Sequence, residues 1–252
     1  MLKYISIILF FIILISNGCK KTSSPVTNKN CRLLSYTADT IDVKFQYEND
    51  KLIKVEAYSN KTAGMLLDYY TFQYQSPTEI VKTDYDAAGN IYAVYKNDLN
   101  ADNSVSKCTS ISYQDIRNVY DTILYTYDSN GYLITMDSKE YYQYLNPTQN
   151  YSSTFSNSYT YPNSGTCITT SSANGSSPKY STTEFYTNLY AQTNSTLYTP
   201  YNYGKSSFFF LKSLNHESFT YKFDSMGNMI QQIIMENNTN TPFVTTFTYN
   251  CQ

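Results

Sequence analysis

Aromatic and aliphatic residues alternate with polar residues over short stretches along most of this sequence. Val43, Phe45 and Tyr47 fall on one side of an extended chain, with a lysine and a glutamine between them. The same alternation returns at residues 219–223 and 244–249. A period of two is typical of β-strands that bury one face and leave the other in water. The pattern therefore predicts an all-β fold.

One turn motif recurs between the predicted strands. It consists of an aromatic residue, Asp, two variable residues, Gly, one further residue and an apolar residue. The Asp carboxylate can accept hydrogen bonds from the backbone N–H groups that follow it, and Gly can take the positive φ that such a turn requires. We interpret the three Asp residues as turn formers; a catalytic or metal-binding role is the alternative. The copies are Tyr85–Ile91, Tyr127–Leu133 and Phe223–Met229.

Weaker copies of the motif occupy residues 48–51, where Asn49 or Asp50 takes the left-handed position, and residues 161–165. The copies are irregularly spaced, which argues against a propeller or a solenoid. Short strands and tight turns instead predict a large antiparallel meander sheet, curled or partly closed to limit its free edges. At most one or two short helices are expected, at Ser138–Leu145 and Phe209–Leu214.

The N-terminal residues have the features of a secretion signal. Lys3 precedes the apolar run 5–15, which is too short to span a bilayer as a helix. The Gly-Cys pair that ends at Cys19 resembles the lipobox of bacterial lipoproteins, which implies cleavage before Cys19 and lipidation of this residue. A plain secretion signal is the alternative. We therefore expect a signal peptide at 1–18, a lipidated Cys with a flexible tether at 19–30, and a single β domain at 31–252.

Composition limits the classes of partner. The net charge of -2 gives no reason to expect nucleic acid. The 29 Tyr and 13 Phe residues suit a sheet with one buried and one wet face, because a tyrosine ring packs while its hydroxyl reaches water. This composition favours a protein outside the cytoplasm.

Four cysteines remain after Cys19. An even number in an oxidising compartment is compatible with two disulfides. Cys31 and Cys251 lie at the two ends of the predicted domain, and domain ends are often close together. This favours a Cys31–Cys251 pair with Cys108–Cys167 as the second; free buried thiols are the alternative.

No catalytic, cofactor-binding or metal-binding residues are predicted. The only histidine, His216, has no zinc ligands at suitable spacing and no Gly-x-Ser-x-Gly motif to support a catalytic triad. Residues 98–109 resemble the first half of a calcium loop, but Asn103 replaces the expected Gly and Thr109 the expected Glu. A hairpin turn through Asp102 and Asn103 is the favoured interpretation, with calcium binding as the alternative.

The set of turns resembles the YD repeats of Rhs-type bacterial proteins. Combined with Cys19, it looks more like a group of uncharacterised Bacteroidota lipoproteins with several YD-like hairpins in one domain. This resemblance implies a β fold and a cell-envelope location and implies no reaction. The residues that carry it are Cys19, Tyr85–Asn90, Leu99–Asp102, Tyr127–Gly131 and Pro200–Asn228.

These observations favour a non-catalytic envelope lipoprotein, which acts as a scaffold or binds a glycan or a protein or peptide ligand. Its expected place is the outer membrane, anchored by lipid and facing the periplasm or the cell surface. Two alternatives remain. An envelope hydrolase acting on polysaccharide or peptidoglycan would need two carboxylates in one cleft. An adhesion or assembly component would pair through a free sheet edge.

Overall fold

A computed structural model describes most of the chain from Cys31 onward. The predicted signal peptide and tether, with Cys19, lie outside the described residues, and so does His216. The described residues are 31–62, 64–163, 166–190, 209–214, 217–225, 228–236 and 241–251.

The described residues form sixteen β-strands and one short 3-10 helix, η1 at Pro147–Gln149. None of them belongs to a helix long and apolar enough to cross a membrane. The strands are β1 Cys31–Ala38, β2 Ile41–Glu48, β3 Lys51–Ser59, β4 Met65–Ser76, β5 Glu79–Asp86, β6 Ile91–Leu99, β7 Val105–Gln114, β8 Arg117–Tyr127, β9 Leu133–Tyr144, β10 Tyr151–Asn163, β11 Thr166–Ala173, β12 Lys179–Tyr190, β13 Phe209–Leu214, β14 Glu217–Phe223, β15 Met229–Glu236 and β16 Phe243–Cys251.

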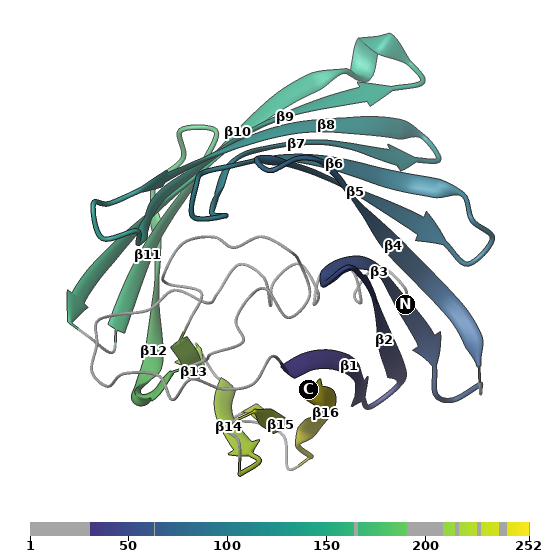
Figure 1. Ribbon diagram of the computed structural model, residues 1–252. Helices are drawn as coiled ribbons and strands as arrows, with labels where there is room; N and C mark the ends of the chain where they lie inside the picture. Colours follow the sequence, from purple (N-terminus) through teal and green to yellow (C-terminus); the bar gives the residue numbers. More distant parts are fainter. Residues whose placement is uncertain are drawn as a thin grey trace.

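Each strand pairs antiparallel with the next along the chain, and β16 pairs with β1 to close the sheet into a barrel. Figure 1 shows β4 to β10 as a broad curved wall, with β14, β15, β16 and β1 opposite. The all-β meander predicted from the sequence is confirmed, and the sheet curls until its first and last strands pair. Because every described strand has two neighbours, the described sheet offers no free edge.

Both predicted helices are wrong. Ser138–Tyr144 belongs to β9, where Glu140 and Tyr142 share one face of the strand and Tyr141 between them faces the other way. The local sequence fits a helix or a strand, and pairing with β8 and β10 decides for the strand. Phe209–Leu214 is β13, which is held by backbone pairing with β12 and β14.

The repeated turns have the predicted chemistry. In the β5–β6 turn, the Asp86 carboxylate accepts a hydrogen bond from the backbone N of Asn90 at 2.8 Å, and Gly89 has φ +88°. In the β8–β9 turn, Asp128 Oδ1 accepts from the backbone N of Tyr132 at 2.8 Å, and Gly131 has φ +82°. Asp224 accepts from Asn228 in the same way. These Asp side chains therefore form turns.

The segment that resembled a calcium loop is a further copy of this turn. The backbone N of Asn100 donates to the carbonyl oxygen of Ser104 at 2.8 Å, the closing bond that Asp86 makes with Asn90. Asn103 takes the left-handed position with φ 62°. The Asp102 carboxylate accepts from the backbone N and the hydroxyl of Ser104. The favoured hairpin interpretation therefore describes this segment.

Substitution at the β8–β9 turn separates backbone strain from carboxylate chemistry. Gly131→Val is expected to lower the free energy of unfolding by about 2 kcal/mol, because a β-branched residue is strained at positive φ. Asp128→Asn is expected to cost less than half as much, because the amide oxygen can accept the same hydrogen bonds. Urea denaturation of both variants measures the difference. A larger loss for Asp128→Asn would contradict the turn interpretation.

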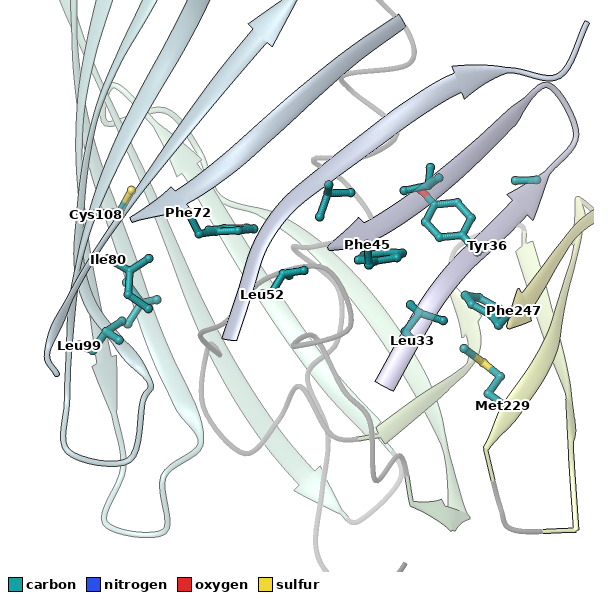
Figure 2. Close-up of a cluster of buried hydrophobic side chains, with 14 residues drawn as sticks. Leu33, Tyr36, Phe45, Leu52, Phe72, Ile80, Leu99, Cys108, Met229 and Phe247 are labelled. Carbon is teal, nitrogen blue, oxygen red and sulfur yellow. The ribbon is translucent and has the colours of Figure 1, made fainter. Parts of the chain in front are cut away.

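One face of the sheet is apolar and buried. In β2, Val43 and Phe45 are buried, whereas Lys44 and Gln46 are exposed. A single buried cluster combines side chains from β1 to β7, β15 and β16 (Figure 2). Only the inward face of a closed sheet brings side chains from so many strands into contact, so the apolar side chains point into the barrel. A smaller cluster joins β9, β10 and β11.

The outward face carries charged and amide side chains. Lys54 and Glu56 form an ion pair at 2.7 Å, and Gln46 donates to the same carboxylate at 2.8 Å. Lys96 and Glu79 form another pair at 2.7 Å. These residues lie at the positions of β2, β3, β5 and β6 that alternate with the buried ones. The outward positions of these four strands are therefore polar, whereas the buried cluster on the opposite face is apolar.

Of the two disulfides predicted from the sequence, one is present in the structure and the other is not. Cys31 and Cys251 form a disulfide across the β1–β16 seam. Cys108 in β7 and Cys167 in β11 are both free and buried, so the second predicted pair is wrong. Neighbouring strands lie about 4.8 Å apart, and four such steps exceed the Cα separation of about 6 Å that a disulfide requires. Burial raises the pKa of Cys108 to about 12, which keeps it a thiol.

Candidate functional site

A cavity of about 630 Å³ opens at the barrel end that carries the disulfide. In an antiparallel meander every second turn lies at the same end. The β2–β3, β4–β5 and β6–β7 turns therefore meet at the end where β1 begins and β16 finishes. The cavity lies among these three turns. Its lining residues are Tyr47, Asp50, Lys51, Leu52, Tyr74, Ser76, Pro77, Ile80, Leu99 and Asn103.

The inner part of the cavity is apolar. Leu52, Ile80 and Leu99 are nearly inaccessible to water and belong to the main buried cluster (Figure 2). They come from β3, β5 and β6, so the barrel wall itself forms this part of the lining. An apolar group of a ligand placed here would leave water and gain the corresponding burial free energy.

Two tyrosines shape the sides of the cavity. Tyr74 donates its hydroxyl hydrogen to the carbonyl oxygen of Leu52 at 3.0 Å, which fixes the ring against the β3 backbone. Burial raises the pKa of Tyr74 to about 12 and also raises that of Tyr47, so both phenols are neutral at physiological pH. Neutral phenols with half-buried rings offer a ligand packing surfaces and hydroxyl groups.

Charged groups stand at the opening. Lys51 Nζ lies 4.7 Å from the centroid of the Tyr74 ring, a cation–π contact. Asp50 forms an ion pair with Arg32, and Arg32 in turn lies over the Tyr47 ring. Asn49 and Asp50 both have positive φ, which makes the tight turn that carries Lys51 to the opening. The cavity therefore joins an apolar interior to a charged rim.

Elsewhere on the inner wall, a lysine occupies a cage of two rings and a carboxylate. Lys82 Nζ lies 2.7 Å from an oxygen of Asp84, and 4.4 Å and 4.8 Å from the ring centroids of Tyr70 and Tyr95. Burial raises the pKa of Asp84, and the charge of Lys82 opposes this rise. Lys82 thus neutralises a carboxylate that the barrel wall removes from water.

Two more carboxylates face each other on this wall. Asp121 and Glu140 are direct cross-strand partners in β8 and β9. Burial raises the pKa of Asp121 to about 6, although a hydrogen bond from Ser138 at 2.7 Å lowers it. Glu140 accepts a hydrogen bond from the Tyr142 hydroxyl. No group of three or more His, Cys, Asp and Glu side chains that could hold a metal ion occurs among the described residues.

The cavity residues were not identified from the sequence. Turns at residues 48–51 and at Ser76-Pro77 are recognisable, but each appears as an isolated feature. In a meander, two turns that are separated by two strands lie at the same end of the sheet. The number of predicted strands between these turns would therefore have placed both of them at one end. That count also needs every strand between them to be recognised. The disulfide, in contrast, places a predicted pair, Cys31 and Cys251, at the cavity end.

Comparison with known proteins identifies a fold and no family. No protein-family pattern matches the chain, and no curated protein matches it. Among solved structures, the chain is similar to the crystal structure of a porin-like protein from Bacteroides uniformis ATCC 8492. The sequences are 15% identical, the TM-score is 0.52, and the match covers 92% of this chain and 100% of the other. At this identity the similarity concerns the fold alone.

Proposed function

We propose that this protein is a non-catalytic, lipid-anchored binding protein of the cell envelope, and that its cavity holds part of a peptide or of a similar amphipathic ligand. The observation that carries the proposal is the cavity of about 630 Å³, which joins an apolar interior to tyrosine hydroxyls and charged rim groups. Pockets of about 300–1,000 Å³ with this mixture of surfaces are typical of small-molecule sites, and a side chain or end of a peptide is a group of that size.

The distribution of polar groups favours a barrel outside the bilayer over a channel like that implied by the name of the porin-like neighbour. A membrane-spanning barrel presents an apolar band about 25 Å tall to lipid. Here the outward positions of β3, β5 and β6 hold the Lys54–Glu56 and Lys96–Glu79 ion pairs, and exposed apolar side chains such as Leu124 are found on other strands. The apolar cluster fills part of the interior, beside the charged groups of the inner wall, and a water-filled pore would not contain such a cluster. Attachment to the membrane is therefore assigned to the lipid on Cys19.

The remaining alternatives have less support. The cavity lining contains one carboxylate, Asp50, and it is paired with Arg32, which does not favour a hydrolytic carboxylate pair there. The wall carboxylates already have partners, Asp84 with Lys82 and Asp121 with Ser138. Assembly through a sheet edge is disfavoured because the described strands close on themselves.

Blocking the cavity tests the proposal. The amphipathic dye 1-anilinonaphthalene-8-sulfonate combines fused rings with an anion and serves as the probe. Ser76→Trp places an indole in the cavity lining and is expected to weaken dye binding by at least about tenfold, or about 1.4 kcal/mol. Fluorescence titration of the purified protein measures the dissociation constant.

Gln75→Trp is the matched control. Gln75 is the neighbouring exposed residue, and it bonds to Gln73 on the outward face. This variant should bind the dye as the unchanged protein does. Equal affinity of the dye for all three proteins, with unchanged circular dichroism, would contradict the assignment of the cavity as a binding site.

A further inference from the structure

A stack of three planar groups lies at the barrel end opposite the cavity. Arg117, Tyr142 and Tyr151 come from the three neighbouring strands β8, β9 and β10. The rings of Tyr142 and Tyr151 are stacked with centroids 4.4 Å apart and an interplanar angle of 13°. The guanidinium carbon of Arg117 lies 4.9 Å from the centroid of the Tyr142 ring. The middle ring therefore has neighbours on two sides.

Tyr151 ends this stack, and strand register leaves its outer side without a neighbour from β11. Tyr151 pairs with Tyr142 of β9, but the pairing of β10 with β11 begins only at Phe155, opposite Ala173. Tyr151 therefore extends past the end of β11. The residue is 47% exposed although it occupies an inward-facing position of its strand. Figure 1 shows the β9–β10 hairpin reaching beyond its neighbours at this end.

The stack is held rigidly by hydrogen bonds. Arg117 donates from Nη1 to the Tyr144 hydroxyl at 2.7 Å and from Nε to Gln114 at 2.8 Å. Tyr142 donates its hydroxyl hydrogen to Glu140. Because these side chains are fixed before a ligand arrives, little conformational entropy is lost when the stack is extended by one more planar surface.

Polar side chains follow Tyr151 along the inner face. Ser153 follows on the same face of β10, and its hydroxyl donates to Asn174 Oδ1 at 3.3 Å. Glu140 is the cross-strand partner of Ser153. These side chains supply both donors and acceptors beside an exposed ring. Ser153 and Asn174, which lie further along this face, are polar and suit the hydroxyl groups of a sugar better than the apolar ring of an aromatic side chain.

We propose that Tyr151 forms a stacking site for one sugar ring of a neutral glycan. The C–H face of a pyranose packs on the open side of the phenol ring, and its hydroxyls bond to Ser153 and Asn174. Tyrosine suits such a ligand because its ring is apolar and its edge is wet. The site lies at the other end of the barrel from the cavity and does not rest on the function proposed for it.

Affinity electrophoresis tests this site. The purified full chain is run through native gels that contain one of the neutral polysaccharides xyloglucan, barley β-glucan, galactomannan, laminarin and dextran, and through a gel that contains the anionic polygalacturonate. Retardation is expected in at least one gel. Tyr151→Ala should reduce the apparent affinity by at least about tenfold, whereas Tyr151→Phe, which keeps the ring, should retain most of it. Tyr180→Ala is the matched control, since Tyr180 is 73% exposed and lies on the outward face of β12.

Four results would overturn the proposal. They are migration unaffected by all five neutral polysaccharides, equal retardation of Tyr151→Ala and the unchanged protein, retardation by polygalacturonate alone, and loss of retardation in Ser76→Trp. Polygalacturonate alone would indicate attraction to charge through Arg117. Loss in Ser76→Trp would place the glycan in the cavity at the other end. Melting temperatures of the variants show whether each remains folded.

Discussion

Replacing Cys31 and Cys251 together by serine is expected to lower the free energy of unfolding by about 4 kcal/mol. The bond joins residues 220 positions apart, so it restricts the unfolded chain over almost the whole domain. It also holds the seam where β1 meets β16. Guanidinium denaturation of the purified protein, under oxidising conditions, measures the loss.

A reducing agent provides the control for this variant. Reduction should bring the unchanged protein to the stability of the double variant and should leave the double variant as it was. Cys108 and Cys167 are already free and buried, so reduction does not alter them. An equal loss in both proteins upon reduction would show that the stabilisation comes from a source other than this bond.

Lys82→Met is expected to cost about 3 kcal/mol of unfolding free energy at pH 7, because it leaves a buried carboxylate without its partner. The side chains of Lys82 and Asp84 are 18% and 8% exposed. The variant also loses the cation–π contacts with Tyr70 and Tyr95. Thermal or urea denaturation between pH 4 and pH 8 measures both the loss and its dependence on pH.

The sign of the pH dependence follows from Asp84. Burial raises the pKa of Asp84 in the folded protein above its ordinary value, so Asp84 binds a proton more readily in the folded state than in the unfolded state. Removal of Lys82 removes the one opposing charge and raises that pKa further. The deficit of the variant should therefore be largest above the folded pKa and shrink as the pH falls through it. A deficit that grows with acidification would contradict the buried-pair explanation.

Lys96→Met is the control for the ion pair itself. Lys96 pairs with Glu79 at the same 2.7 Å distance, but the two side chains are 49% and 30% exposed. Water already solvates this pair, so its removal should change stability little. The comparison separates the effect of burial from the effect of a short ion-pair distance.

Local features of the fold were predictable because their causes are local. The Asp and Gly of the β5–β6 and β8–β9 turns make the hydrogen bonds and the positive φ angles that their side chains favour. Alternation along residues 43–47 likewise appears in the structure as a strand with one buried face. Each of these predictions depends on residues within about one turn or one strand.

Closure and the binding surfaces were not predictable for the opposite reason. The β1–β16 pairing depends on residues at the two ends of the chain, and no local pattern specifies it. The Tyr151 surface arises because β10 extends past β11, a difference in strand length that the sequence does not mark. The predicted helix at Ser138–Leu145 is wrong because the side-chain pattern of this segment suits either a helix or a strand, and only pairing with neighbouring strands decides between them.

The closing seam also sets the order in which the molecule can be completed. β1 is made first and β16 last, yet each is the partner of the other. A chain that lacks residues 243–251 would expose two strand edges, on β1 and on β15, and exposed edges pair readily with other chains. Such long-range pairing also slows folding. The newly made polypeptide therefore depends on β16 to escape aggregation, and truncations that remove this strand should be as damaging as large deletions.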